Sequence, residues 1–275
     1  MTILQALILG IIQGITEFLP VSSTGHLILV PSIFNWELQN LTFDVALHLG
    51  TAFAVLSYFM KNWIIMVKSL ILDVSSAHLV NFSYINKLRR DTKLFLTIIL
   101  VSIPVGIAGI LFGDTVEIFF RSPLLVSVML ILVSFVMLFA EKYSFRLTNK
   151  KIELSFFDSL LISLSQIVAL IPGTSRSGIT ISTGLFRGIK REEVAKFSFL
   201  LATPVILGAA VLKAPLVFKM QSEELLPLFV GFLSSFIVGF LSIKWLLGFL
   251  KNHSLIPFAI YRIVLGVVIL YNSLA

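Results

Sequence analysis

The stretch FLPVSSTGHL, residues 18–27, interrupts a strongly apolar sequence with a proline, three consecutive hydroxyl residues, a glycine and a histidine. A second stretch, LIPGTSRSGI at residues 170–179, has a similar composition. Each is followed by an apolar segment, 24–35 or 178–186, that is shorter than the roughly 20 residues a transmembrane helix needs. Irregular backbone at membrane depth is tolerated only inside protein or beside a wet cavity. The pattern therefore predicts two re-entrant helical hairpins, in which the chain enters the membrane, breaks and returns to the same face.

The composition excludes an ordinary soluble protein. Of the 275 residues, 57% are hydrophobic and 13% are charged, and the mean hydropathy is +1.02, whereas soluble domains have about 25% charged residues. The 25 Phe residues and the scattered Gly and Pro favour packed helices over a β-barrel. No cysteine is present, so disulfides and thiolate metal sites are excluded. The net charge of +7 arises from Lys and Arg in short loops, so we expect a lipid bilayer as the partner and no nucleic acid.

We therefore predict an all-α polytopic membrane protein, a single integral membrane domain over residues 1–275 built as an inverted repeat. Hairpins at 3–35 and 154–186 leave six full spans, at 43–60, 94–113, 123–140, 194–216, 226–250 and 256–274. The first repeat covers about 1–140 and the second about 154–275, with Pro20 aligned on Pro172 and Ser23 on Ser175. Because each half crosses the membrane three times, the two hairpins enter from opposite faces. Both tips are therefore expected to meet near the midplane, where transporters built from repeats place their sites.

Loop charge predicts the orientation. Segments 61–93 and 141–153 are rich in Lys and Arg, whereas 114–122 holds Asp114 and Glu117 with Arg121 alone. The positive-inside rule places the first two segments in the cytoplasm and both termini outside. We interpret the mixed segment 62–84 as an interfacial helix and loop, with a seventh span as the alternative.

The first motif has residues suited to phosphate chemistry. Gln13 and Glu17 are four residues apart and share a helix face, and a carboxylate inside a membrane is costly unless it faces protein or water. Ser22, Ser23, Thr24 and Gly25 precede the short helix, whose free backbone N–H groups form an anion site. His26 follows in its first turn, where it is expected to reach the bound anion and exchange a proton.

The second motif repeats the anion site and adds a positive charge. Arg176 offers planar, bidentate donors that suit phosphate oxygens. Its small neighbours are predicted to contact the same substrate: Gly173, Thr174, Ser175, Ser177 and Gly178. His48 and Gln166 are weaker candidates, because each is also a plausible helix-packing residue. Neither a P-loop nor a zinc-binding histidine pattern is present in the sequence. Together the two motifs predict a mid-membrane site for a phosphate-bearing substrate.

The segments QGITEFLPVSSTGHL, LIPGTSRSGITIS and FSFLLATPVILGA closely resemble the undecaprenyl pyrophosphate phosphatases of the bacitracin-resistance (BacA/UppP) family, and the resemblance runs over nearly the whole chain. It implies a multi-pass enzyme of the bacterial inner membrane. That enzyme hydrolyses the polyprenyl diphosphate lipid undecaprenyl pyrophosphate to undecaprenyl phosphate and inorganic phosphate. This recycles the carrier lipid of cell-wall synthesis and gives bacitracin resistance. The resemblance also implies two re-entrant hairpins and six spans in inverted repeat.

By position, the resemblance implies a catalytic site of Glu17, Ser23, His26 and Arg176, with Gln13 in the family's Glu/Gln-x-x-x-Glu motif. Ser23 is the expected nucleophile and His26 the expected base and acid, with direct attack by water as the alternative. The family's divalent cation is expected to be Mg²⁺ or Ca²⁺, bound by carboxylate and phosphate oxygens with Glu17 as the candidate ligand. Gln13 replaces a glutamate found in many members and weakens the prediction of a two-carboxylate metal site.

The competing functional class is transport, because inverted repeats and broken helices are also features of transporters. A polyprenyl-phosphate flippase or anion carrier would use Arg176 and the helix ends for binding alone. A binding site would not need Glu17 and His26 beside a run of serines, which favours the enzyme. The sequence leaves open which leaflet the site faces and whether two copies form a homodimer.

Overall fold

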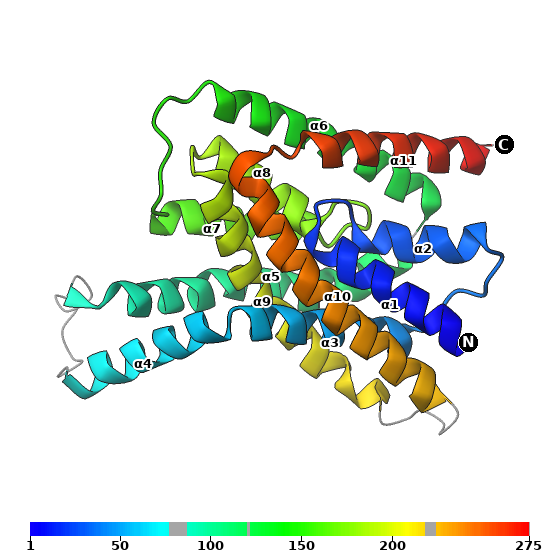
Figure 1. The fold of residues 1–275 in the computed structure, drawn as a ribbon, viewed down its shortest axis with the longest axis horizontal. Helices are drawn as coiled ribbons and strands as arrows, with labels where there is room; N and C mark the ends of the chain where they lie inside the picture. Colours follow the sequence, from blue (N-terminus) through cyan, green and yellow to red (C-terminus); the bar gives the residue numbers. More distant parts are fainter. Residues whose placement is uncertain (77–86, 120–121, 218–223, 275) are drawn as a thin grey trace.

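The computed structural model describes residues 1–76, 87–119, 122–217 and 224–274. Within these ranges the chain forms eleven α-helices and no β-sheet (Figure 1). The helices are α1 Ile3–Phe18, α2 Ser23–Ile33, α3 Leu41–Tyr58, α4 Met60–Ser76, α5 Arg90–Phe119, α6 Pro123–Phe145, α7 Phe156–Val168, α8 Arg176–Phe186, α9 Arg191–Val217, α10 Leu225–Asn252 and α11 Ile256–Leu274. The prediction of an all-helical chain is confirmed.

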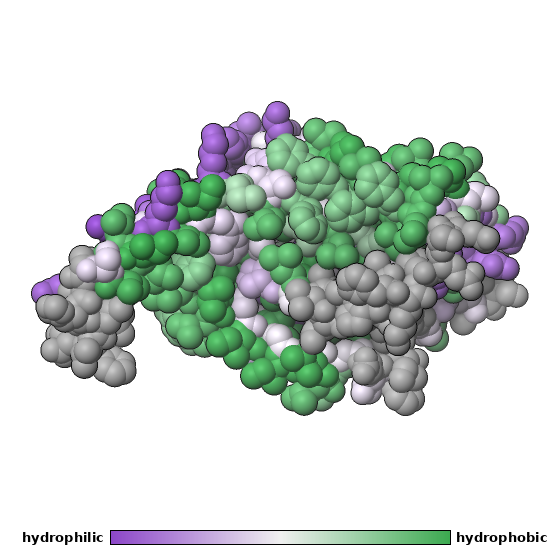
Figure 2. All heavy atoms as spheres, turned by 90° about the horizontal axis from the view of Figure 1, so that it is seen from below, coloured by the Kyte–Doolittle hydropathy of each residue, from purple (hydrophilic) through white to green (hydrophobic). Residues whose placement is uncertain are grey.

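The helices suit a membrane. Four are long and apolar enough to cross it, over Leu41–Tyr58, Arg90–Gly113, Pro123–Phe145 and Leu225–Asn252. The other two expected spans, 194–216 and 256–274, are also helical, as α9 and α11. Large apolar side chains are exposed on the spans, with Ile110 66% and Leu111 65% accessible. Figure 2 shows apolar residues over most of one face, with hydrophilic residues gathered toward its edges. A multi-pass membrane protein follows from these features.

Both predicted hairpins are formed as a helix, a break and a short returning helix. The first consists of α1 and α2 joined by residues 19–22, and the second of α7 and α8 joined by residues 169–175. Ser22 and Ser175 adopt the same rare backbone conformation directly before the returning helix, with φ of 76° and 68°. The equivalent positions are therefore Ser22 with Ser175 and Ser23 with Arg176. The alignment of Ser23 on Ser175 was wrong by one residue, because the second hairpin has one more residue between its proline and the returning helix.

The segment interpreted as interfacial begins with a helix. α4 continues almost directly from α3 after Phe59 and packs against the first part of α5, and this pair extends away from the other helices in Figure 1. Asp73 of α4 accepts a hydrogen bond from Thr92 of α5 at 2.6 Å. The rest of the segment, residues 77–84, lies outside the described residues. α4 is not among the helices that meet the criteria for a membrane span.

Buried ion pairs hold one end of the helix assembly together. Glu141 of α6 accepts two hydrogen bonds from Arg191 of α9 and one from the backbone of Leu255, just before α11. Asp158 of α7 pairs with Arg187, just beyond α8. The Lys- and Arg-rich segment 145–155 lies at this end, while both termini lie at the opposite end (Figure 1). The basic segment and the termini are therefore on opposite sides of the spans.

Candidate active site

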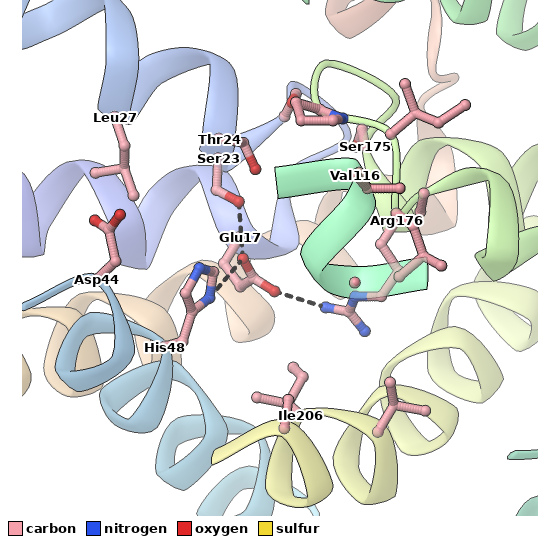
Figure 3. A pocket seen from close by; sticks show the side chains of 18 of the residues that line it. Glu17, Ser23, Thr24, Leu27, Asp44, His48, Val116, Ser175, Arg176 and Ile206 are labelled. Carbon is pink, nitrogen blue, oxygen red and sulfur yellow. Dashed lines mark hydrogen bonds and ion pairs between the residues drawn. The ribbon is translucent and has the colours of Figure 1, made fainter. Parts of the chain in front are cut away.

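The two hairpin tips face a common cavity of about 400 Å³ (Figure 3). Residues of both hairpins form its polar wall together with α3, while α5 and α9 form an apolar wall. The helix ends of both hairpins converge on the cavity because each tip reverses direction within a few residues. α2 and α8 begin here, so the positive ends of two helices flank the same volume.

Glu17 is the centre of the polar wall. It lies in the last turn of α1, and its side chain is 9% exposed. Its Oε2 atom accepts hydrogen bonds from Ser23 Oγ at 2.9 Å and from Gln13 Nε2 at 3.1 Å. Its Oε1 atom accepts one from Arg176 Nη2 at 3.2 Å. The structure thus brings Glu17, Ser23 and Arg176 together, although Glu17 and Arg176 are separated by 159 positions in the sequence.

The local fold explains this convergence. Ser23 is the first residue of α2 and Arg176 the first residue of α8, so equivalent positions of the two hairpins meet the same carboxylate. One supplies a hydroxyl group and the other a guanidinium group. A carboxylate within hydrogen-bond reach of a serine can accept its proton, and the neighbouring arginine donates to the other oxygen of the same carboxylate.

His26 does not border the cavity, contrary to the expectation that it reaches the bound anion. Its Nδ1 atom donates to the carbonyl oxygen of Ser22 at 2.7 Å, and its Nε2 atom accepts from the hydroxyl of Tyr261 on α11 at the same distance. Both ring nitrogens are therefore used in the protein. The helix turns by about 300° between Ser23 and His26, which directs the imidazole toward α11. The expectation that His26 reaches a bound anion is corrected by this geometry, and its role as base stays a prediction that the geometry does not support.

His48, a weaker candidate from the sequence, borders the cavity. It lies on α3, and its Nδ1 atom is 2.9 Å from Gln13 Nε2 and 3.6 Å from Glu17 Oε2. Its side chain is 40% exposed. Figure 3 shows its ring beside Glu17, on the side away from Arg176. Gln13 does not border the cavity but lies behind Glu17 and His48 and contacts both.

The remaining predicted residues divide into two groups. Five border the cavity: Ser22, Thr24, Gln166, Gly173 and Ser175. Four do not: Gly25, Thr174, Ser177 and Gly178. The second group supports the hairpins instead, as when Thr174 Oγ1 donates to the carbonyl oxygen of Val168, and Gly178 N donates to Ser175 Oγ as a helix cap.

Several buried polar atoms at the cavity lack a partner among the described residues. They are both amide atoms of Gln166, which is 3% exposed, and Nη1 of Arg176. An unpaired buried donor or acceptor costs about 1–3 kcal/mol. Gln166 and Arg176 both border the cavity, so a ligand with several acceptor oxygens would satisfy their donors.

Two residues at the site were missed by the sequence reasoning, and Asp44 is the first. It borders the cavity on α3, one turn before His48, and accepts a hydrogen bond from Gln39 Nε2 at 2.9 Å. Its signal was available in the stretch FDVALHLG, where an acidic residue four positions before a histidine shares a face of an apolar helix.

Arg262 of α11 is the second missed residue, and it is fully buried. Its Nη2 atom donates to the carbonyl oxygens of Gly173 and Thr174, both at 3.0 Å, and its Nη1 atom to that of Pro20 at 3.5 Å. One guanidinium group therefore links the tips of both hairpins. An arginine within the apolar stretch IPFAIYRIVLG was the available signal, because an ionisable residue in a span is rarely without function.

The donor set at the cavity fits a hard divalent cation. Carboxylates of Glu17 and Asp44 both border it, and Mg²⁺ is commonly held by one or two carboxylates together with substrate phosphates. The described residues contain no group of three side chains able to hold a metal ion by themselves. Both carboxylates also take part in hydrogen bonds within the protein, Glu17 with Ser23, Gln13 and Arg176 and Asp44 with Gln39.

Comparisons with known proteins identify the family. Residues 6–268 match the family described as "Bacitracin resistance protein BacA". A protein of Thermodesulfovibrio yellowstonii named undecaprenyl-diphosphatase is 46% identical over 96% of this chain and 95% of its own. Proteins of the same name from Moorella thermoacetica and Methanosphaera stadtmanae are 42% and 39% identical, and each alignment covers at least 97% of both chains. The chain belongs to the BacA family.

Proposed function

We propose that the protein is an undecaprenyl-diphosphatase, which hydrolyses undecaprenyl pyrophosphate to undecaprenyl phosphate and inorganic phosphate. Relatives of that name match almost the whole chain. The observation that supports the reaction best is the hydrogen bond from Ser23 Oγ to Glu17 Oε2 at 2.9 Å, with Arg176 on the other carboxylate oxygen. A site that only binds and moves a lipid phosphate has no need of a serine paired with a carboxylate, so this pair favours hydrolysis over transport.

The diphosphate group binds between the hairpin tips. The unpaired Nη1 atom of Arg176, the amide N–H group of Gln166 and the N-terminus of α8 stabilise the negative charge of its terminal phosphoryl group. The polyprenyl chain leaves the cavity along its apolar wall, which includes Val116 of α5 and Ile206 of α9 (Figure 3). α5 also presents exposed apolar side chains, such as Ile110 and Leu111, along which the tail would reach the lipid.

Ser23 is the nucleophile in the first step. Its Oγ atom bonds to the terminal phosphorus while Glu17 accepts the hydroxyl proton, and the bond from that phosphorus to the bridging oxygen breaks. The bond's electrons leave with undecaprenyl phosphate, which takes the proton from Glu17. In the second step Glu17 accepts a proton from water as the water oxygen bonds to phosphorus. The phosphorus–Oγ bond breaks, Ser23 recovers its proton from Glu17 and inorganic phosphate leaves.

A divalent cation, when bound, would offset negative charge on the diphosphate. Asp44 would hold it, together with phosphate oxygens of the substrate. We further propose the bacterial inner membrane as the location, with both termini outside, because the basic segment 145–155 lies at the opposite end of the spans. The two halves form an inverted repeat in this proposal, supported by the matching backbone of Ser22 and Ser175.

The test measures phosphate release from undecaprenyl pyrophosphate by purified protein in detergent. Wild type and Ser32→Ala, a variant at an exposed serine on the same helix as Ser23, should release phosphate equally. Ser23→Ala should release almost none. If wild type releases no phosphate but moves the intact diphosphate lipid from one leaflet of a vesicle membrane to the other, the proposed hydrolysis is wrong and the protein is a lipid transporter.

A further inference from the structure

His48 and Gln13 form a contact that the proposed mechanism does not use. Gln13 lies on α1, is fully buried, and places Nε2 2.9 Å from Nδ1 of His48. The same Nε2 atom is 3.1 Å from Glu17 Oε2. The Gln13 amide group therefore lies between the histidine and the catalytic carboxylate.

The carboxylate fixes the orientation of this amide. A carboxylate oxygen only accepts hydrogen bonds, so the atom of Gln13 that faces Glu17 must be the NH₂ group. If the amide were turned over, its Oε1 atom would lie against Oε2 of Glu17, and two acceptors would repel each other. The second hydrogen of the same NH₂ group then points to Nδ1 of His48.

This orientation decides which nitrogen of His48 has the proton. Nδ1 accepts a hydrogen bond from Gln13, so it has no proton of its own. The proton of the neutral imidazole is therefore on Nε2, for which the structure shows no hydrogen-bond partner among the described residues. The imidazole borders the cavity, on the side of Glu17 away from Arg176 (Figure 3).

We propose that His48 is a further group that contacts the substrate: a neutral hydrogen-bond donor, held in the Nε2–H tautomer by Gln13, for an oxygen of the bound diphosphate. This inference rests on the proposed function and deepens it. His48 does not transfer a proton, since loss of Nε2–H from a neutral ring would leave an imidazolate. A neutral imidazole can polarise a phosphoryl oxygen as a fixed donor, as neutral histidines do in other enzymes. Arg176 and His48 would then hold the diphosphate from two sides.

The tautomer can be measured without turnover. In ¹⁵N-histidine-labelled protein in detergent micelles near neutral pH, the signal of His48 is assigned by its loss in His48→Gln. We expect wild type to show an unprotonated Nδ1 and a protonated Nε2. Gln13→Leu removes the donor to Nδ1 and should give a mixture of tautomers. His253→Gln, at the exposed end of α10, is the control and should leave the His48 signal unchanged.

Kinetics test the contact with the substrate. Removing a preorganised donor of this kind costs about 10²–10³ in kcat, so His48→Ala should lose activity on that scale with an unchanged melting temperature. His48→Gln keeps an N–H donor of similar reach and should recover part of the loss. His253→Ala should be as active as wild type.

Two results would overturn the inference. One is a wild-type His48 with its proton on Nδ1, and the other is a His48→Ala enzyme with normal kcat and KM in a preparation where Ser23→Ala is inactive. The second outcome leaves the hydrolase proposal intact. A wild-type protein that releases no phosphate at all would instead remove the proposed function, while the tautomer measurement would still decide the role of Gln13.

Discussion

Ser23 Oγ donates a hydrogen bond to Glu17 Oε2 across the tip of the first hairpin, at 2.9 Å. The two residues lie on opposite arms of the break, at the end of α1 and the start of α2. The contact therefore exists only because the helix is interrupted between them. In the proposed mechanism this contact pairs the nucleophilic hydroxyl directly with its base, so that His26 is not needed to activate Ser23.

Ser23→Ala should reduce kcat by about 10³-fold or more, because only the electrostatic part of the site remains once a nucleophile is removed. Wild type stopped with acid during turnover of substrate labelled in its terminal phosphate should contain label on Ser23. A Ser23→Ala enzyme with near-normal turnover and no labelled intermediate in wild type would show that water attacks directly.

Glu17→Gln should lower kcat by about 10²–10⁴, the usual contribution of a general base. Glutamine can still accept the hydrogen bond of Ser23 but cannot take its proton, so substrate binding should change less than turnover. Glu37→Gln, an exposed site after α2, is the control and should behave as wild type. A raised KM with an unchanged kcat in Glu17→Gln would assign Glu17 to binding alone.

His26 and Tyr261 should behave as one structural unit, because Tyr261 donates to His26 Nε2 at 2.7 Å outside the cavity. His26→Ala and Tyr261→Phe should each lower activity and melting temperature together. The loss of unfolding free energy in the double variant should be smaller than the sum of the losses in the two single variants. The difference, the coupling energy, should be about 0.5–3 kcal/mol, as expected for two residues that share a hydrogen bond. If His26→Ala removes one limb of the pH–rate profile and Tyr261→Phe does not, His26 is the base after all.

The sequence predicted the helices and the breaks well, because span length and the Pro-, Ser- and Gly-rich motifs are local signals. It also placed Glu17, Ser23 and Arg176 in one site. It failed where the direction of a side chain decides the role. His26 and His48 are both histidines on apolar helices, and only their rotation around the helix separates the one that faces α11 from the one that faces the cavity.

Arg262 shows a second limit of the sequence. A single arginine in a span has no partner that spacing can reveal. Most acceptors of Arg262 are backbone carbonyl oxygens, such as those of Pro20 and Gly173, and its side-chain acceptor, Ser134 Oγ at 3.0 Å, is 128 positions away in the chain. Backbone acceptors leave no trace in residue type. The predicted alignment of the two hairpins was wrong by one residue, because one extra residue in the second loop does not change the residue types on either side of it.

Arg262→Lys should lower kcat by about 10²-fold, the cost of misplacing reacting groups by about 1 Å. Lysine keeps the charge but lacks the planar fork that reaches Pro20 in one hairpin and Gly173 in the other. Trypsin accessibility and melting temperature report on folding. The control is the reverse exchange, Lys244→Arg, at an exposed position of α10 outside the cavity, which should leave activity unchanged. Full activity in Arg262→Lys would show that the hairpin tips hold their positions without this link.

The apolar wall of the cavity predicts where the polyprenyl chain lies. Val105, Gly113 and Val116 of α5 border the cavity, and Gly109 lies on the same helix face. A Cβ atom added at Gly109 or Gly113 would meet no described atom within 4 Å. Glycine within a helix costs about 1 kcal/mol relative to alanine, so Gly109 and Gly113 do not stabilise α5. The open space beside them is instead consistent with room for a bound apolar chain.

Gly113→Leu should therefore raise KM for undecaprenyl pyrophosphate by about 10-fold or more, because leucine would occupy the volume that the first isoprene units need. Farnesyl pyrophosphate, with a shorter tail, should be affected less, since fewer of its contacts lie along α5. Gly248→Leu is the matched control: its Cβ also enters open space, but in α10 outside the cavity. Equal KM values for both substrates in Gly113→Leu and wild type would mean that the tail leaves the site by another route.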